Sequence, residues 1–247
     1  MIWIIGGTKD SRDFVESFPF KEKLIVTTAT EYGGKLLEGV GKIKVFCKRM
    51  DRVGMENFIK ENNIMMTIDL SHPYAAEVSQ NAIDASKFLG IEYVRFEREN
   101  LEHEDGVIEF KNIFPMIDYI ETLEGNILVT LGSNNLDKFK ELKNISNIYF
   151  RILPKWDMVK KAEDLGILPK NIIAMQGPFS KELNMAMMKQ LDIKYMISKK
   201  GGNTGGEKEK LDATKEVGAT SILLSRPSIE YPLVFSNIND IISYIAK

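Results

Sequence analysis

The feature that most constrains the fold of this chain is an alternation of short apolar runs with longer amphipathic stretches, which continues from one end to the other. The apolar runs are rich in β-branched residues, as buried strands are, and helical stretches lie between nearly every pair of them. Residues 2–5 and 127–131 are almost wholly apolar, which is typical of strands covered by helices on both faces. The alternation predicts an α/β fold with a mainly parallel sheet in each half.

The predicted strands fall into two groups. Those of the first half cover residues 1–5, 24–29, 43–47, 64–70, 92–97 and, more weakly, 107–110. Those of the second half cover residues 127–131, 148–153, 172–176, 195–198 and 221–224. The acidic stretch 101–105 between the groups is the predicted boundary, which gives one domain of residues 1–105 and another of residues 106–247.

The clearest helical signal follows Pro73. Four apolar residues repeat at spacings of four, three and four, which places them on one helical face: Val78, Ala82, Ala85 and Leu89. Pro73 is expected in the first turn of this helix, and Gly90 is expected to end it.

The chain has one cysteine, Cys47, and two histidines, His72 and His103. These are too few for an internal disulfide or for a zinc or iron–sulfur cage, so no metal site is expected and a reducing cytoplasm is the expected compartment. Cys47 lies in a predicted strand and is expected to be a small core residue. No apolar run approaches the roughly 18 residues of a membrane span, so no membrane insertion is expected.

The formal net charge of −2 conceals a separation along the chain. Residues 1–125 carry 15 Lys and Arg against 22 Asp and Glu, whereas residues 126–247 carry 18 against 13. Two interpretations stay open: unselected halves often differ by several charges, or the basic half meets a negatively charged ligand. The near-neutral total gives no reason to expect a nucleic-acid partner.

Loops that follow strands are the candidate sites, because ligands of open α/β sheets bind beyond the carboxyl ends of the strands. Residues 6–12, Gly-Gly-Thr-Lys-Asp-Ser-Arg, follow the first strand and lead into a helix, an arrangement that suits either a phosphate or a tight connection. Residues 69–76 carry Asp69, Ser71, His72 and Tyr74, which are either site residues or helix caps.

Three loops of the second half are further candidates. Residues 131–135 and 176–180 contain glycine beside Ser or Asn, which suits a ligand loop or a turn with a helix cap. Residues 198–208 contain Lys199 and Lys200 before four glycines, which indicates either an anion-binding lid or a solvated loop. The chain has neither the Gly-x-x-x-x-Gly-Lys-Ser/Thr loop of P-loop NTPases nor the Gly-x-Ser-x-Gly elbow of α/β-hydrolases.

Taken together, these loops resemble those of the precorrin-6A reductase family, including its cobalt-precorrin-6A branch. The resemblance rests on Gly6-Gly7-Thr8 with Asp10 and Arg12, residues 69–76, residues 95–98, residues 176–180, Lys199 with Gly201-Gly202, and Lys210-Leu211. The resemblance covers nearly the whole chain, and the matching segments occur in the same order as in the family.

The resemblance implies two Rossmann-like domains and reduction of one macrocycle double bond in (cobalt-)precorrin-6A, giving (cobalt-)precorrin-6B in cobalamin biosynthesis. A hydride would come from NADH or NADPH, and a proton would reach the neighbouring carbon. The coenzyme residues it implies in the N-terminal domain are Gly6, Gly7, Thr8, Asp10, Arg12, Thr28, Ser71, His72, Pro73 and Tyr74. The second predicted strand ends in mixed residues, Thr27-Thr28-Ala29-Thr30-Glu31, so the choice between NADH and NADPH stays open.

The substrate implied is a tetrapyrrole rimmed with carboxylates, which needs several cations around an apolar floor. The substrate residues expected are Arg95, Arg98, Ser133, Arg151, Gln176, Gly177, Pro178, Phe179, Lys199, Lys200 and Gly201. No residue is assigned as the proton donor. Transient contact with neighbouring enzymes of the pathway is also expected.

Two alternative functions remain. One is a dinucleotide-binding sensor without catalysis. The other, which ranks lower, is a short-chain-type reductase or epimerase of a small substrate.

Overall fold

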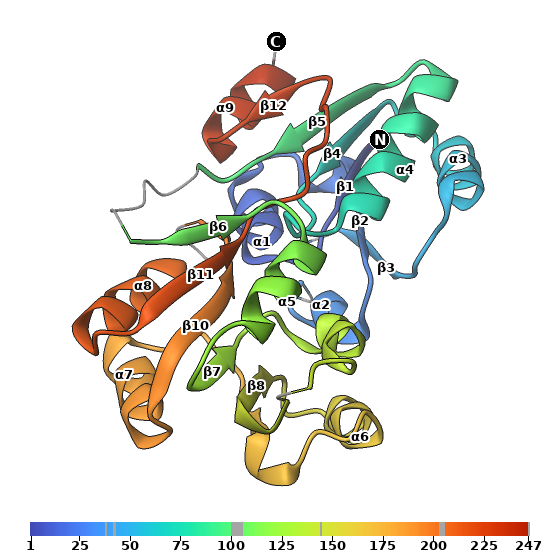
Figure 1. The fold of residues 1–247 in the computed structure, drawn as a ribbon. Coiled ribbons are helices and arrows are strands. Elements are labelled where there is room, and N and C mark those ends of the chain that lie inside the picture. The colour runs from blue at the N-terminus through green and yellow to red at the C-terminus, as the bar shows by residue number, and fades with distance from the viewer. Residues whose placement is uncertain (38, 42, 100–105, 144, 203–205, 247) are drawn as a thin grey trace. The chain divides into compact units, whose positions relative to one another are not determined.

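A computed structural model describes residues 1–37, 39–41, 43–99, 106–143, 145–202 and 206–246 of the chain. Within this part of the chain, the strands form two sheets of six, and all neighbouring strands are parallel. The chain divides into two compact units, coloured along the sequence in Figure 1: unit 1 is Met1–Glu99 with Pro227–Lys247, and unit 2 is Asn100–Arg226. The predicted α/β fold with parallel sheets is confirmed.

Unit 1 has the strand order β3-β2-β1-β4-β5-β12, the usual order of a Rossmann-type sheet. Its strands are β1 (Ile2–Ile5), β2 (Leu24–Thr28), β3 (Lys44–Cys47), β4 (Met66–Asp69), β5 (Glu92–Phe96) and β12 (Val234–Phe235). Its helices are α1 (Lys9–Ser17), the short 3₁₀ turn η1 (Lys21–Lys23), α2 (Glu31–Lys35), α3 (Arg52–Glu61), α4 (Ala76–Leu89) and α9 (Ile238–Ile245).

Unit 2 repeats this order as β9-β8-β7-β10-β11-β6. Its strands are β6 (Ile108–Phe110), β7 (Asn126–Val129), β8 (Ile148–Ile152), β9 (Ile172–Ala174), β10 (Ile193–Lys199) and β11 (Thr220–Leu224). Its helices are α5 (Ile113–Glu121), α6 (Trp156–Asp164), α7 (Lys181–Gln190) and α8 (Glu207–Glu216), with 3₁₀ turns η2 (Ser133–Phe139), η3 (Ile145–Asn147) and η4 (Pro169–Asn171).

The sixth strand of each sheet is exchanged. β6 comes directly after β5 of unit 1 but pairs with β11 in unit 2, and β12 comes directly after β11 but pairs with β5 in unit 1. The predicted second domain, residues 106–247, is therefore corrected at its C-terminal end, because β12 and α9 complete unit 1. The predicted boundary stretch 101–105, with His103, lies outside the described residues.

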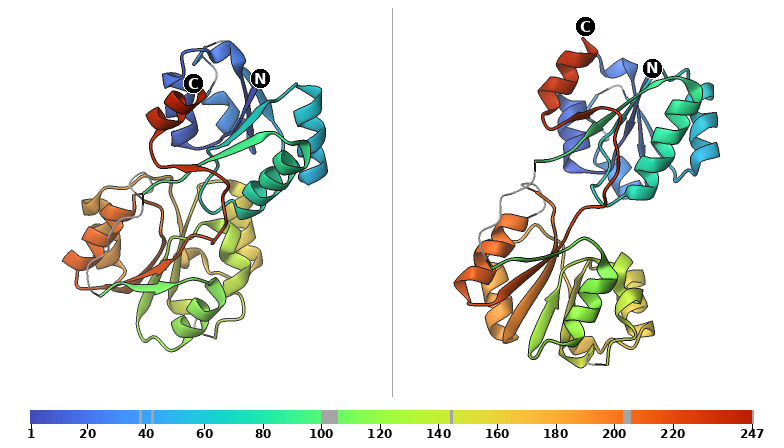
Figure 2. Two further views of the ribbon diagram at one scale, coloured as in Figure 1. Left: turned by 90° about the horizontal axis from the view of Figure 1, so that it is seen from above. Right: turned by 45° about the horizontal axis from the view of Figure 1, so that its top comes forward.

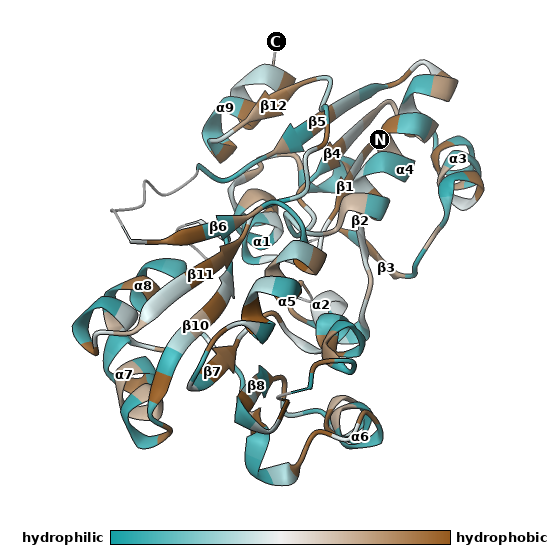
Figure 3. Ribbon diagram, in the orientation of Figure 1, coloured by the Kyte–Doolittle hydropathy of each residue, from teal (hydrophilic) through white to brown (hydrophobic). Residues whose placement is uncertain are grey.

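Helices cover both faces of each sheet (Figure 2). In unit 1, Phe14 of α1 and Ile241 of α9 are buried on one face, and Phe58 of α3 and Ala82 of α4 are buried on the other. The hydropathy colouring shows the same division, with brown on strands such as β7 and teal on helices such as α7 and α8 (Figure 3). Burial on both faces explains why central strands such as β1 and β7 are largely apolar.

All eleven predicted strands are present, and the two-residue β12 is an addition. Helix α4 ends as predicted at Gly90, which adopts a left-handed φ of 67°. Its start is corrected: the N-cap is Ala75, so Pro73 lies before the helix and not in its first turn. Cys47 is also corrected, because β3 is an edge strand and leaves its thiol exposed.

Candidate functional site

The carboxyl ends of β1 and β4 form the point in unit 1 where the strand order reverses direction. There the Thr8 hydroxyl donates a hydrogen bond to the Leu70 carbonyl at 2.8 Å and so joins the two loops. Gly7 has a φ of 101°, and a Cβ at this position would meet no atom within 4 Å. In open α/β sheets this point is where ligands bind. Gly7 therefore leaves open space beside the backbone where the sheet topology favours a ligand.

Helix α1 begins at this point with a reciprocal cap. The Thr8 side chain accepts from the Ser11 amide at 3.1 Å, and the Ser11 hydroxyl accepts from the Thr8 amide at 3.1 Å. The amides of Lys9 and Asp10, in the first turn, lie too early in the helix to have an intrahelical acceptor. They are available to a phosphate.

Asp10 and Arg98, predicted to bind coenzyme and substrate respectively, bind each other. Nε and Nη2 of Arg98 both donate to one Asp10 oxygen, at 2.8 and 2.6 Å, and both side chains are largely buried. This ion pair neutralises the carboxylate in the first turn of α1. Arg12, two residues further along the same helix, is half-buried and keeps a positive charge near the helix start.

Asp69, at the end of β4, is the centre of a buried network. One oxygen accepts from the Ser71 amide at 2.8 Å, and the other accepts from the hydroxyls of Ser79 at 2.6 Å and Tyr93 at 2.7 Å. Neither Asp69 nor Ser71 caps α4, whose N-cap has no side-chain bond. The Asp69 carboxylate therefore fixes the backbone of the loop that carries Ser71 and His72.

Arg95 completes the network from β5 and is 0% exposed. Its guanidinium lies 2.9 Å from Asp69 and 2.6 Å from Glu97, and it donates to the Ser71 hydroxyl at 3.1 Å. Burial alone would lower the pKa of Arg95, but the two carboxylates raise it above its ordinary value. This fully buried, doubly paired arginine holds the loop, and its expected role in substrate binding stays a prediction.

The rest of the predicted coenzyme residues surround the same edge. His72 is exposed, its Nδ1 accepts from the Tyr74 amide at 3.2 Å, and the rings of His72 and Tyr74 lie 5.8 Å apart. Pro73 between them is buried. Thr28, at the end of β2, is buried, and its hydroxyl donates to the Thr30 carbonyl at 3.0 Å. The carboxyl ends of β1, β2 and β4 therefore bring these residues to one edge.

In unit 2 the strand order reverses direction between β7 and β10, and Arg151 comes from β8 on the far side of β7. Arg151 is 8% exposed. Its Nη1 donates to Asn184 Oδ1 at 2.7 Å, and its guanidinium lies 4.3 Å from the Phe179 ring centre. Burial lowers its pKa to about 10. This arginine has a neutral amide and an aromatic ring as partners, in contrast to Arg95.

Two lysines, one at the end of β10 and one on α8, lie at the same edge of the sheet. Burial and the Arg151 charge together lower the pKa of Lys210, on α8, to about 8. Burial and the Lys138 charge lower the pKa of Lys199, at the end of β10. Lys199 also acts on Lys210 in the same direction. The carboxyl edge of unit 2 therefore gathers positive charge on β8, β10 and α8.

Glu207 holds the loop between β10 and α8. It is 1% exposed, and its Oε2 accepts from the amides of Gly201 at 2.6 Å and Gly202 at 2.7 Å. Gly201 thus uses its amide inside the protein. Lys200, predicted to bind substrate, pairs with Glu109 of β6 at 3.0 Å. Lys200, the second lysine of the predicted lid, therefore contacts the edge strand β6. Residues 203–205 of that loop lie outside the described residues.

The remaining predicted substrate residues follow β7 and β9. Ser133 is half-buried at the start of η2, while Gln176, Gly177 and Pro178 are exposed in the loop after β9. Ser180 caps α7 by accepting from the Leu183 amide, so the capping interpretation holds for that residue. Phe179 is half-buried beneath Arg151 and is the member of this loop that touches the cationic cluster.

Sequence reasoning missed two residues of the unit 2 cluster. Asn184 is fully buried and orients Arg151, yet it reads as an ordinary polar residue of a helix. Lys210 belongs to the matched Lys210-Leu211 pair, which was the available signal, but it lies in a charged helical stretch where a lysine suggests a solvated face.

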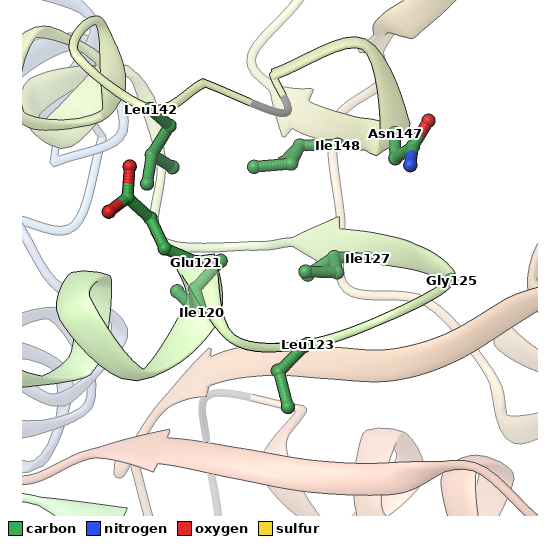
Figure 4. Close-up of a pocket in the computed structure, with 8 residues that line it drawn as sticks. All are labelled: Ile120, Glu121, Leu123, Gly125, Ile127, Leu142, Asn147 and Ile148. Carbon is green, nitrogen blue, oxygen red and sulfur yellow. The ribbon is translucent and has the colours of Figure 1, made fainter.

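Other features of the described residues carry no chemistry. A small pocket lined mainly by apolar side chains, among them Ile120, Ile127 and Ile148, lies at the amino ends of β7 and β8, away from the carboxyl edge (Figure 4). The described ranges hold no group of three or more His, Cys, Asp or Glu that could bind a metal ion. A search of the same ranges found no helix long and apolar enough to cross a membrane.

Comparisons with known proteins match this chain to reductases of one family. A family model described as precorrin-6x reductase CbiJ/CobK matches residues 1–246. The cobalt-precorrin-6A reductase of Methanocaldococcus jannaschii is 36% identical over 99% of this chain and 97% of its own, and that of Priestia megaterium is 33% identical over 98% and 96%. A solved CobK precorrin-6A reductase matches with a TM-score of 0.79 at 18% identity, over 99% of this chain and 96% of its own, which supports the fold.

Proposed function

Because the chain belongs to the precorrin-6x reductase family, we propose that it reduces cobalt-precorrin-6A to cobalt-precorrin-6B with a hydride from NADH or NADPH. The match of the family model over residues 1–246 carries this proposal. An oxidoreductase of this family acts on a CH–CH bond and belongs to cobalamin biosynthesis. The cobalt-containing substrate is preferred because the relatives that share a third or more of their residues with this chain bear that name.

The carboxyl edge of unit 1 fits a nicotinamide dinucleotide. Gly7 leaves open space beside the backbone, and the first turn of α1 offers the amides of Lys9 and Asp10 to a diphosphate. Arg12 adds positive charge, and the Asp10 carboxylate is neutralised by Arg98. Gly6, Gly7, Thr8, Arg12 and the loop 71–74 would hold the coenzyme.

The coenzyme, when bound, supplies the hydride. The protein's part is to orient the reactants and exclude competing reactions. Asp69 and Arg95 keep the loop with Ser71, His72 and Tyr74 in one conformation, and this loop follows the strand next to β1. Either coenzyme is compatible with the end of β2, where the Thr28 hydroxyl donates to the Thr30 carbonyl and Glu31 is exposed.

The carboxyl edge of unit 2 suits the tetrapyrrole polycarboxylate. Arg151 is buried with a neutral amide as its hydrogen-bond partner, and Lys199 stands at the end of β10. A carboxylate is the counter-ion that best compensates such a buried guanidinium. Phe179 offers an apolar surface in contact with Arg151. Arg151, Lys199, Phe179 and Ser133 are the substrate residues that this geometry favours.

The direct test is to mix the purified chain with NADH or NADPH and add cobalt-precorrin-6A anaerobically, following the loss of absorbance of the reduced coenzyme. Oxidation that depends on the tetrapyrrole is the expected result. Tight coenzyme binding without turnover would instead identify a dinucleotide sensor.

Lys199→Ala tests the division of labour between the units. We expect the KM for the tetrapyrrole to rise about tenfold, since one charged contact to a carboxylate is lost, with the coenzyme dissociation constant unchanged. Steady-state kinetics and coenzyme titration measure the two quantities. Equal loss of both affinities would contradict the assignment of coenzyme to unit 1 and tetrapyrrole to unit 2.

A further inference from the structure

The buried guanidinium of Arg151 has no carboxylate partner among the residues that the structure describes. The ion pairs among the described residues include neither Arg151 nor Lys210. A buried charge is costly unless it is paired, and Asn184 and the Phe179 ring compensate it only in part. The missing counter-ion is therefore expected to come from a ligand.

The groups around Arg151 reinforce this expectation. Lys199 and Lys210 bring two more positive charges from β10 and α8. Two acids of α8, Glu207 and Glu209, act on Lys210. One Glu207 oxygen already accepts from the amides of Gly201 and Gly202. Arg151 and Lys210, which form no ion pair among the described residues, thus bring two positive charges to the edge of the sheet where a ligand is expected.

We propose that Lys210 is the third cation of a carboxylate site whose other members are Arg151 and Lys199. This inference rests on the proposed function, because the carboxylate would belong to the acetate or propionate rim of the tetrapyrrole. Helix α7, whose Asn184 accepts from Arg151, packs against α8, and the Arg151 charge acts on Lys210, so a carboxylate that lies against Arg151 comes close to Lys210. The Phe179 ring, against the Arg151 guanidinium, would contact the apolar part of the same ligand.

The proposed site predicts that the protein takes up a proton when the carboxylate binds. Burial, with Arg151 and Lys199, lowers the pKa of Lys210 to about 8, while Glu207 and Glu209 act in the opposite direction. A bound carboxylate favours the charged form and raises this pKa. Above about pH 8 the ligand must therefore bring a proton onto Lys210, and its affinity falls, at most tenfold for each further pH unit.

Calorimetric titration of the full chain with uroporphyrin I, a stable macrocycle that carries acetate and propionate groups, tests the proposal. Titrations from pH 6.5 to 9.5 in two buffers with different heats of ionisation give the affinity and the number of protons taken up. We expect the wild-type chain to take up protons near pH 8 and to lose affinity above it. Lys210→Met should bind about tenfold more weakly at pH 7, take up fewer protons near pH 8 and lose less affinity as the pH rises.

Two further variants separate the charge of Lys210 from its titration. Lys210→Arg keeps a permanent positive charge at this position. It should bind uroporphyrin I at pH 7, and its affinity should depend less on pH up to pH 9.5 than that of the wild type. Lys208→Met is the matched control, because Lys208 lies on the same helix, is exposed and pairs with Asp212. It should behave as the wild type.

The proposal is overturned if uroporphyrin I fails to bind, if binding takes up no proton, or if Lys210→Met keeps the wild-type affinity and pH profile. Turnover of cobalt-precorrin-6A distinguishes this failure from that of the proposed function. If the wild-type chain turns over cobalt-precorrin-6A and Lys210→Met leaves the KM unchanged, the proposed function stands and the carboxylate site at Lys210 is contradicted. If the chain takes up a proton when it binds uroporphyrin I but never oxidises the coenzyme, the carboxylate site stands and the proposed function is contradicted.

Discussion

At the scale of the residue, two buried arginines determine what each unit offers to a ligand. Arg95 lies between Asp69 and Glu97, so its charge is balanced within unit 1 and serves to hold a loop. Arg151 lies against Asn184 and Phe179, and no carboxylate of the described part of unit 2 pairs with it. The same side chain is thus structural in one sheet and available to a ligand in the other.

Asp69→Asn is expected to destabilise the chain by about 3–5 kcal/mol, because it leaves Arg95 buried with one carboxylate fewer. Urea unfolding, monitored by circular dichroism, measures the change. Asp164→Asn is the control, since its ion pair with Lys160 is exposed and should cost less than about 1 kcal/mol. Similar losses in the two variants would show that the Asp69 network contributes no more than a surface pair.

Gly7→Ala is expected to weaken coenzyme binding, because a φ of 101° is strained for a residue with a Cβ and the added methyl enters the open space beside the loop. Gly39→Ala is the matched control: Gly39 has a φ of 94° and equally open surroundings, but it lies after α2. Both variants should lose about 1 kcal/mol of stability. Only Gly7→Ala should lose affinity for NADH or NADPH in a fluorescence titration, and equal affinity in the two would contradict the site.

The sequence predicts which loops carry polar residues but not how the charges pair. Asp10 and Arg98 are 88 positions apart, and their ion pair depends on α1 and β5 meeting at one edge. Arg95 and Arg151 both stand in apolar strands, so their local patterns are alike although their partners differ. Partners from distant elements are what a single sequence does not specify.

At the scale of the element, the two sheets share an order but prepare for anions differently. Gly7 after β1 and Gly132 after β7 both have positive φ, at equivalent positions. In unit 1 the next element is α1, whose capped first turn presents backbone amides. In unit 2 it is the 3₁₀ turn η2, without a side-chain cap, and the positive charge comes from side chains. A diphosphate suits the first arrangement and scattered carboxylates suit the second.

Ile241→Ala in α9 is expected to cost about 2–5 kcal/mol, because Ile241 is fully buried in the core of unit 1. Trp3, buried in β1, reports on that unit by fluorescence when Trp156 of unit 2 is replaced by Phe. Asn239→Ala, on the exposed face of α9, should change stability by less than about 0.5 kcal/mol. A Trp3 transition unaffected by Ile241→Ala would contradict the place of α9 in unit 1.

Central strands such as β1, β2 and β7 were predictable because burial on both faces makes their sequences largely apolar. β12 was not, since its two residues, Val234 and Phe235, are too few to form a pattern. The exchange of β6 and β12 was not predictable either. A strand's own sequence suits either sheet edge, and the choice depends on which neighbour it pairs with.

At the scale of the whole molecule, the chain passes from unit 1 into unit 2 once and returns once. A fragment of residues 1–105 should therefore fail to fold, because it lacks β12 and α9. A chain of residues 1–99 joined by a short Gly/Ser linker to residues 227–247 should fold, since it contains every element of unit 1. Circular dichroism and amide NMR dispersion distinguish the two outcomes, and a cooperatively folded fragment 1–105 would contradict the exchange.

The exchanged strand also sets an order of events during synthesis. A chain leaves the ribosome from its N-terminus at about 5–20 residues per second, and domains fold as they emerge. Unit 2 is continuous in sequence, so all of it has emerged while the last 21 residues of unit 1 are still to come. The edge of β5 stays unpaired during that interval. The unit that begins the chain is thus the last to be finished, and a premature stop anywhere before residue 234 leaves it open at that edge.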